Sequence, residues 1–337
     1  MADKPIWFCV TAKSGLGHLR RVTNIASIIK LNAPGRPLAL MTNAPVAGLT
    51  TQERDYFGDR EVVPREQMGG RLKTFRNSPV VVDTAVVPGL ADVDAPLCLI
   101  LRETKTDKLT HFRLQKNRQW DLVIVPNPVE QWRPDAALLP ARRVENVGWI
   151  FRTNTAKDYR QLTDERNKQQ SMSSILLVSG GGGTMDTANE YCKITTRLVA
   201  SVRHLTQTEF RVVQVVGPRA DPNAVITGVD EVATPGARLP ELLEQADIVV
   251  STVGYNSVLE LAQIDVPTLL IPIKRSYDDQ CLRARRWGPS LGLAHIDLQQ
   301  STQWIARLID NPQRRPRIDI NSSGASVAAD LVGNLAA

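Results

Sequence analysis

Short runs of apolar and often β-branched residues recur along the chain, and longer stretches with apolar residues at helical spacing separate them. Such runs are typical of strands that are covered on both faces in a parallel sheet. They predict strands over residues 6–12, 38–41, 80–83, 97–101, 122–125, 175–179, 210–216, 247–252 and 266–273. The longer stretches predict helices over about 19–31, 106–118, 186–202 and 239–245, whereas residues 45–78 have weak periodicity and no clear assignment.

The order of strands and helices repeats in two halves of similar size, each with a glycine loop after its first strand. Several prolines and then the stretch 142–152 separate the halves, as expected of a connector. The pattern predicts an α/β chain with two doubly wound Rossmann-like domains facing each other across a cleft. We expect these domains to span residues 1–148 and 149–337, with closing helices from about residue 301.

The stretch from Asp247 to Gln280 predicts a ligand site in the second half. A buried strand ends near Gly254, and the spacing of Ser257 and Glu260 predicts a capping box at the start of a helix. The first-turn amides of such a helix form a ready anion site. Asp279 and Gln280 follow the next strand and open another helix. Ligands bind at this edge of an open α/β sheet.

The composition limits the class of protein. The chain has 337 residues, no apolar run near the ~20 residues that span a bilayer, and no secretory signal at its start. We therefore expect a cytoplasmic protein. The four cysteines are scattered without C-x-x-C spacing, which predicts reduced thiols and neither a disulfide nor a metal site.

The net charge of +6 is unevenly distributed along the chain. Residues 1–150 contain 21 Lys and Arg against 15 Asp and Glu, whereas the remainder has 20 of each. An anionic acceptor or peripheral contact with an acidic membrane surface would fit this excess, and so would a solvated basic surface without a partner. Nucleic acid is not expected as a partner, because the basic residues are dispersed and few aromatic residues accompany them.

His18 is the candidate catalytic base. It follows a glycine turn at a helix start, where the helix terminus disfavours the imidazolium and favours a neutral base. A structural role for a single histidine is the alternative. Arg20 and Arg21 are expected to be surface charges or to face a phosphate. The first loop has Arg20 where a dinucleotide fingerprint requires glycine, and the second loop has no Gly-Lys-Ser/Thr of a P-loop.

A metal motif is also present but is not expected to bind metal. Asp92-Val93-Asp94 has the D-x-D form of Mn²⁺-dependent glycosyltransferases, yet it lies far in sequence from Asp247–Gln280.

The run Gly15-Leu16-Gly17-His18-Leu19-Arg20-Arg21 resembles the amino-terminal signature of GT-B glycosyltransferases of the family 28 type. Downstream, residues 246–251, 266–272 and 278–280, with Gly254, Ser257 and Glu260, look like the donor-binding half of that family. Residues 45–78 and 150–172 carry no similarity. Asp83-Thr84, Gly89-Leu90 and Leu101-Arg102-Glu103 are similar to bacterial proteins known only as predicted glycosyltransferases.

The resemblance implies a GT-B fold and a role for each matching residue. Glu260 would accept hydrogen bonds from ribose hydroxyls, with the capping box as its alternative role. Asp279 and Gln280 would hold the donor sugar. Asp83 and Glu103 follow predicted strands and are candidates to assist His18 or to bind acceptor, or else are buried structural carboxylates. The remaining donor-binding candidates are Gly15, Gly17, Gly180, Gly181, Gly182, Arg238, Gly254, Asn256 and Ser257.

These expectations combine into a metal-independent glycosyltransferase. It would move a sugar from a nucleotide-diphosphate sugar, most simply a UDP-sugar, to a hydroxyl or amine acceptor, and would need no cofactor. Two alternatives remain open. The same base would serve a nucleotide-sugar hydrolase of the kind found in pseudaminic acid synthesis, and a non-catalytic nucleotide-sugar-binding protein would have the same donor half.

Overall fold

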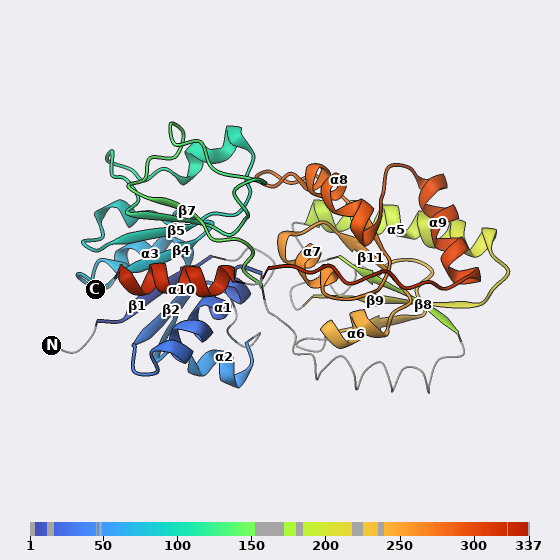
Figure 1. Ribbon diagram of the computed structural model, residues 1–337, viewed down its shortest axis with the longest axis horizontal. Helices are drawn as coiled ribbons and strands as arrows, with labels where there is room; N and C mark the ends of the chain where they lie inside the picture. The colour runs from blue at the N-terminus through green and yellow to red at the C-terminus, as the bar shows by residue number, and fades with distance from the viewer. Residues whose placement is uncertain are drawn as a thin grey trace. The chain divides into compact units, whose positions relative to one another are not determined.

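The computed structural model describes residues 4–11, 17–44, 46, 49–151, 172–179, 185–217, 225–234, 239–321 and 323–335. The chain forms two compact units. Unit 1 comprises Met1–Arg152 together with Asn321–Ala337, and unit 2 comprises Thr153–Ile320 (Figure 1). The first boundary lies close to the expected one. The second does not, because the carboxyl-terminal residues belong to unit 1 rather than to the second domain.

Unit 1 contains a parallel sheet with the strand order β3-β2-β1-β4-β5-β6-β7. All five strands predicted for this half are present. The two additional strands are edge strands, and β3 is mostly exposed and charged, so its pattern gives no hydrophobic signal. The strands are β1 Ile6–Val10, β2 Leu38–Thr42, β3 Asp59–Val62, β4 Val80–Asp83, β5 Leu97–Ile100, β6 Leu122–Val125 and β7 Val144–Asn146.

The helices of unit 1 include one that is shorter than predicted. The expected helix over 106–118 is only a 3₁₀ helix that ends at Phe112. Lys116 and Asn117 have positive φ values of 59° and 54°, which no α-helix accommodates. The helices are α1 Gly17–Asn32, α2 Thr51–Asp55, α3 Arg65–Leu72, η2 Leu90–Asp92, η3 Thr106–Phe112 and α10 Gly324–Asn334.

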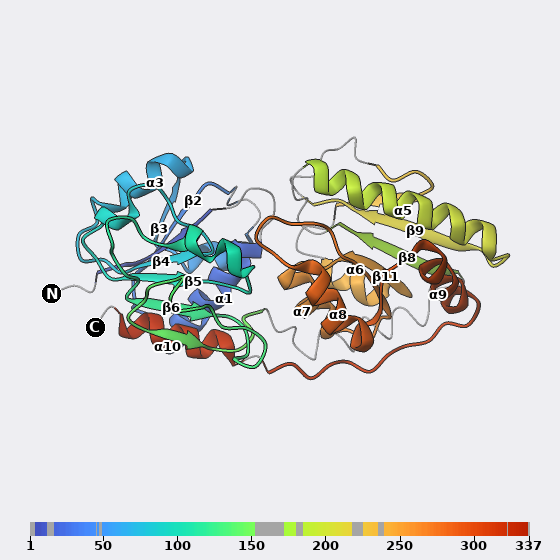
Figure 2. The same cartoon turned by 90° about the horizontal axis from the view of Figure 1, so that it is seen from above.

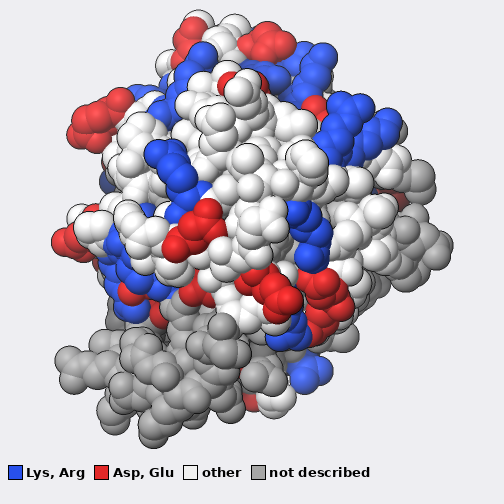
Figure 3. Space-filling view, turned by 90° about the vertical axis from the view of Figure 1, so that its right-hand side faces the viewer, with Lys and Arg blue, Asp and Glu red and all other residues white. Residues whose placement is uncertain are grey.

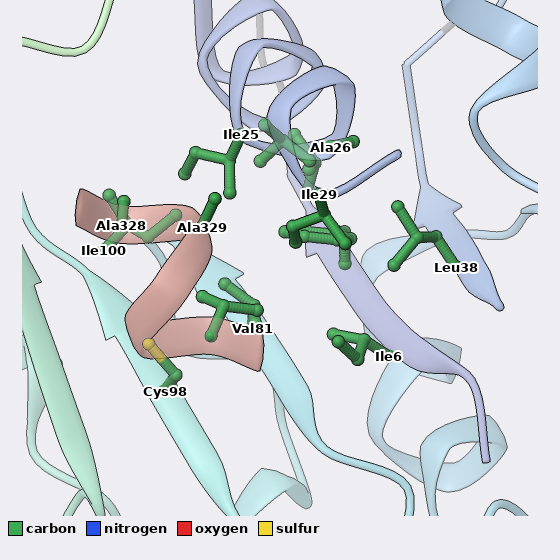
Figure 4. Close-up of a cluster of buried hydrophobic side chains, with 14 of the residues drawn as sticks. Ile6, Ile25, Ala26, Ile29, Leu38, Val81, Cys98, Ile100, Ala328 and Ala329 are labelled. Atoms are coloured by element: carbon green, nitrogen blue, oxygen red, sulfur yellow. The ribbon is translucent and has the colours of Figure 1, made fainter. Parts of the chain in front are cut away.

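The carboxyl-terminal helix α10 packs on the core of unit 1. Ala328 and Ala329 are buried in the same cluster as Ile25 and Ala26 of α1, as Figure 4 shows. Their small side chains allow the two helices to approach closely. A Cβ atom at Gly324 would lie 2.4 Å from the carbonyl oxygen of Trp149, so only glycine fits where α10 begins. The assignment of this helix to the second domain was therefore wrong.

Unit 2 contains a second parallel sheet, with the strand order β10-β9-β8-β11-β12-β13. Figure 2 shows α5 along one face of this sheet and α6 and α7 on the other. The strands are β8 Ser173–Val178, β9 Phe210–Val215, β10 Glu231–Ala233, β11 Ile248–Thr252, β12 Thr268–Ile271 and β13 Gly292–Ala294. The helices are α5 Met185–Leu205, α6 Leu239–Gln245, α7 Tyr255–Ala262, α8 Gln280–Leu291 and α9 Leu298–Asp310.

Arg315 and Arg317 lie in the segment that leads from α9 to α10 and bind it to neighbouring residues of unit 2. The Arg315 amide donates to the Asp265 carbonyl over 2.9 Å, and its Nε donates to the Val266 carbonyl over 3.0 Å. Burial lowers the pKa of Arg315 to about 10, although Asp265 opposes this effect. Arg317 pairs with the buried Glu244 over 3.3 Å. The chain is thus held along unit 2 before it joins unit 1.

The surface of unit 2 carries charges of both signs. Figure 3 shows Lys and Arg side chains interspersed with Asp and Glu across one face. This agrees with the equal numbers of basic and acidic residues after residue 150. No helix within the described ranges combines the length and the apolar character that crossing a membrane requires.

Candidate active site

The switch point of the unit 1 sheet lies between β1 and β4, which neighbour each other but are far apart in sequence. Val10 at the end of β1 pairs with Asp83 at the end of β4. The chain leaves β1 and returns through α1, whose second residue is His18. His18 and Asp83, 65 positions apart, therefore meet at the edge where open α/β sheets bind ligands.

The His18 ring is held by a carboxylate and remains partly open to solvent. Its Nδ1 lies 3.2 Å from Asp83 Oδ1, with side-chain exposures of 27% for His18 and 0% for Asp83. An ionised carboxylate only accepts hydrogen bonds, so this contact places the ring proton on Nδ1. The lone pair is then on Nε2, as a general base requires.

Asp83 is kept ionised by a buried network. Arg21 Nη1 donates to Asp83 Oδ1 over 2.6 Å and to Oδ2 over 2.9 Å, and Thr84 Oγ1 donates to Oδ1 over 2.7 Å. Burial by itself would raise the pKa of Asp83. The charge of the Arg21 guanidinium and the hydrogen bonds from His18 and Thr84 outweigh it and hold this pKa below its usual value.

Arg20 and Arg21, which follow His18 on α1, have different acidic partners, and neither side chain is fully exposed to solvent. Arg21 is only 2% exposed and shares one face of α1 with His18, three positions earlier. Arg20 pairs with Glu53. Burial alone would raise the pKa of Glu53, but hydrogen bonds from Thr50 and the contact with Arg20 hold it below its usual value. Arg21 is thus part of the His18 and Asp83 cluster.

Glu103 is a buried carboxylate after β5, the strand next to β4. Its side chain is 4% exposed, and its backbone amide donates to Asn127 Oδ1 over 3.1 Å. Asn127 follows β6 and is fully buried. Glu103 thus lies at the same sheet edge as Asp83, and its role in acceptor binding stays a prediction.

The corresponding switch point of unit 2 lies between β8 and β11. Thr252 Oγ1 donates to the Ser179 carbonyl over 3.2 Å and ties the two strand ends together. The chain then turns at Gly254, whose backbone is extended, and α7 begins at Tyr255. A Cβ atom at Gly254 would lie 3.2 Å from Ser257 Oγ, so glycine keeps the first turn of α7 uncrowded.

The predicted capping box is absent. Gly254 is the N-cap of α7, and no side chain caps the helix, so the expected N-cap at Ser257 was wrong by three residues. The extended backbone of Gly254 allows the helix to begin directly after it. Ser257 and Asn256 therefore lie in the first turn, where backbone amides point out of the helix end. Glu260 lies in the body of the helix and is half-buried.

Gln280 and Asp279 both hold backbone groups at this edge. Gln280 Oε1 accepts from the amides of Val253 over 3.2 Å and Ile273 over 3.0 Å, and its side chain is 4% exposed. Asp279 caps α8 by accepting from the amide of Leu282 over 2.9 Å. The Gln280 oxygen therefore already accepts two hydrogen bonds, from the residues that follow β11 and β12. Any contact of Asp279 or Gln280 with a sugar stays a prediction.

Arg283 is a residue that the sequence analysis missed. It is 2% exposed, donates to the Val253 carbonyl over 2.9 Å, and pairs with Asp278 over 2.6 Å. It thus joins α8 to the turn that contains Gly254. The sequence could have indicated this burial, because Arg283 lies on the apolar face of α8 together with Ala284 and Trp287.

Several predicted site residues lie outside the described ranges. They are Gly15 of the first glycine loop, Gly180, Gly181 and Gly182 of the second, and Arg238 before α6. Gly17 is described as the first residue of α1. For these positions the sequence-based roles stay predictions.

The D-x-D motif is engaged in ion pairs. Asp92 pairs with Lys73 over 2.9 Å and also with Lys116. Hydrogen bonds from Lys116 and Lys73 lower the pKa of Asp92 to about 2. In the part of the chain that the structure describes, no three His, Cys, Asp or Glu side chains are grouped to hold a metal ion.

Comparison of sequences relates the second half to a transferase family. Residues 175–310 match the glycosyltransferase family 28 C-terminal domain. A UDP-N-acetylglucosamine–N-acetylmuramyl-(pentapeptide) pyrophosphoryl-undecaprenol N-acetylglucosamine transferase from Geobacillus thermodenitrificans is 31% identical over 162 residues, which are 45% of this chain and 43% of that protein. Its namesake from Clostridium botulinum strain Alaska E43 is 26% identical over 237 residues, 68% of this chain and 57% of that protein. The chain thus spans about half the length of these curated relatives.

Solved structures resemble the chain over nearly its whole length. The glycotransferase of kitacinnamycin matches with a TM-score of 0.58 and 16% identity over 98% of this chain and 99% of its own. Spinosyn rhamnosyltransferase SpnG, complexed with thymidine diphosphate, has a TM-score of 0.55 and 15% identity, with 98% and 96% covered. MurG from Acinetobacter baumannii has a TM-score of 0.52 and 12% identity, with 98% and 100% covered. At these identities the likeness shows the fold.

Proposed function

Because this chain has the GT-B fold and carries the C-terminal domain of glycosyltransferase family 28 in residues 175–310, we propose that it is a metal-independent glycosyltransferase. It moves a sugar from a nucleotide-diphosphate sugar, a UDP-sugar in the first instance, to a hydroxyl or amine acceptor. Unit 1 supplies the base and contacts the acceptor, and unit 2 holds the donor.

The contact between His18 and Asp83 carries this proposal. Nε2 of His18 removes the proton of the attacking acceptor group, and the ring becomes an imidazolium. Asp83 holds the opposite nitrogen and stabilises the charge as it forms. A positioned general base of this kind contributes ~10² to 10⁴ to the rate.

The donor half stabilises the departing diphosphate. Negative charge builds up on this group in an oxocarbenium-like transition state, and amides at a helix start stabilise it without rearrangement. The first turn of α7, with Gly254, Asn256 and Ser257, supplies such amides. Glu260, one turn further, accepts hydrogen bonds from the ribose hydroxyls. The diphosphate thus needs no metal in this proposal.

The basic excess in the first half supports an anionic acceptor. Residues 1–150 carry 21 Lys and Arg against 15 Asp and Glu. A net positive charge on this half of the chain raises the local concentration of an anionic molecule. UDP-N-acetylglucosamine, named as the donor of the curated relatives, is the first donor to test.

Binding and turnover together test the proposal. Calorimetric titration of the metal-free protein with UDP, dTDP, GDP and NAD should show UDP binding most tightly. The protein should then hydrolyse UDP-N-acetylglucosamine slowly, and His18→Ala should lower this rate by ~10² to 10⁴ with unchanged UDP affinity. His111→Ala, at an exposed histidine of η3, is the matched control and should retain the wild-type rate.

Other results would redirect or overturn the assignment. Rapid turnover with water alone would identify a nucleotide-sugar hydrolase with the same base. Tight UDP binding without any turnover would indicate a non-catalytic binding protein. If no nucleotide binds, the donor role of unit 2 is wrong.

A further inference from the structure

Thr84, directly after β4, has an unusual backbone conformation. Its φ is +48°, in the left-handed region. Within the described residues, the other non-glycine positions with positive φ are two asparagines and a lysine, so Thr84 is the β-branched member of this group. A β-branched residue is a genuine outlier in this region, because its Cβ substituents crowd the backbone. Such a strained conformation persists only where the surrounding structure enforces it, and strained residues cluster at functional sites.

The strained residue places its hydroxyl on the carboxylate that holds the base. Thr84 Oγ1 lies 2.7 Å from Asp83 Oδ1 and 3.1 Å from the carbonyl oxygen of Ile100. The Thr84 amide already donates to the same Ile100 carbonyl over 2.8 Å. The hydroxyl has only one proton, and the nearer acceptor is the ionised one. The hydroxyl proton therefore belongs to Asp83.

Oδ1 of Asp83 receives three donors from three different positions. They are Nη1 of Arg21 at 2.6 Å, Oγ1 of Thr84 at 2.7 Å and Nδ1 of His18 at 3.2 Å. The contact with His18 is the longest of these and is the one that catalysis uses. Arg21 and Thr84 together determine where the carboxylate oxygen lies, and so how the His18 ring is held.

We propose that Thr84 is a positioning residue, whose strained backbone is retained because its hydroxyl orients Asp83 toward His18. The inference rests on the proposed function, in which His18 is the base. Thr84 acts through Asp83 and does not itself touch the reacting atoms.

Three substitutions at Thr84 separate the hydroxyl from the strain. Thr84→Val keeps the branched shape and removes the hydroxyl. Thr84→Gly removes both the hydroxyl and the strain, since glycine adopts positive φ at no steric cost. Thr84→Ser keeps the hydroxyl without the second branch. Asn117→Gly changes a left-handed residue in another loop and serves as the control.

The kinetic assay is hydrolysis of UDP-N-acetylglucosamine, with Tm measured for every variant. Thr84→Gly should melt at a higher temperature than Thr84→Val, yet both should lose about tenfold in kcat, the loss expected for one hydrogen bond to a charged group. KM and UDP affinity should not change. Thr84→Ser and Asn117→Gly should keep the wild-type kcat. The opposite result is a kcat that rises with Tm, so that Thr84→Gly has a higher kcat than Thr84→Val. In that case Thr84 has a structural role only.

A second measurement decides the inference without turnover. ¹⁵N NMR distinguishes the two imidazole tautomers, and the His18 signals are those that disappear in His18→Ala. The wild-type protein should show the proton on Nδ1, and Thr84→Val should show a mixture. If wild-type protein turns over no UDP-sugar, the proposed function fails while this measurement still tests Thr84. An unchanged His18 tautomer in Thr84→Val would overturn the inference, whether or not the protein turns over a UDP-sugar.

Discussion

Replacing Asp83 by asparagine removes one charge from a fully buried network without a change of size. The carboxylate accepts from Arg21, His18 and Thr84, and both its side chain and that of Arg21 are almost inaccessible to solvent. Asparagine offers one accepting oxygen, and its NH₂ group would face a donor. The buried ion pair between Arg21 and residue 83 is lost, and breaking a buried ion pair costs about 3–5 kcal/mol. For a unit of this size the loss corresponds to a fall in Tm of about 6–20 °C.

The same substitution should also affect the reaction. Without the carboxylate, the Nδ1 tautomer of His18 is no longer favoured, and the imidazolium that forms has no counter-charge. We expect kcat for UDP-N-acetylglucosamine hydrolysis to fall by ~10² to 10⁴, measured well below the new Tm. UDP affinity should stay unchanged, because the α7 residues proposed to hold the diphosphate and the ribose belong to unit 2. If kcat stays at the wild-type value while Tm falls, Asp83 is a structural carboxylate and the proposed base is not oriented by it.

The pH dependence of stability gives an independent check on Asp83. Its folded-state pKa is lowered, so its contribution to the free energy of unfolding is present above the unfolded pKa of about 3.9. This contribution disappears as the pH falls through the folded-state pKa. Wild-type protein should therefore lose stability more steeply than Asp83→Asn below about pH 4. Parallel denaturant curves over that range would contradict the ion pair.

Three further predictions concern the donor half and the D-x-D motif. Glu260→Gln should weaken UDP binding in calorimetry with little change in Tm, whereas unchanged affinity would exclude a ribose contact. Arg283→Met should lower Tm, since it breaks the buried ion pair with Asp278 at a cost of about 3–5 kcal/mol, and should weaken UDP binding by loosening the Gly254 turn. The control Arg285→Met, at an exposed position of the same helix, should do neither. Asp92→Asn should keep wild-type turnover in metal-free buffer, and a loss restored by Mn²⁺ would revive the D-x-D assignment.

The sequence predicted elements wherever burial leaves a pattern. Each predicted strand is present, because a strand covered on both faces must be apolar along its whole length. The edge strands were missed for the opposite reason. β3 is largely exposed and charged, and β10 and β13 have only three residues each. The 3₁₀ helix η3 was predicted too long, because its end depends on the positive φ values of Lys116 and Asn117.

Local spacing also placed several candidate residues correctly relative to the strands and helices. His18 does follow the first strand at a helix start, Gly254 does precede α7, and Asp279 and Gln280 do open α8. Each of these features depends on neighbours within a few residues, which sequence periodicity reports directly. The start of α7 was placed three residues late, because the capping-box spacing of Ser257 and Glu260 suggested a later N-cap than Gly254.

The sequence by itself thus determined the two parallel α/β sheets, the glycine turn before α7 and the place of the candidate base at the start of α1. Only the tertiary structure decided which groups surround that base. The partner of His18 lies 65 positions away, because β4 becomes the neighbour of β1 through crossover connections and not through local contact. The burial of Arg21, the strained Thr84 and the packing of α10 on unit 1 arise in the same way. Each depends on which distant segments come together in the fold, and no local pattern of residues carries that information.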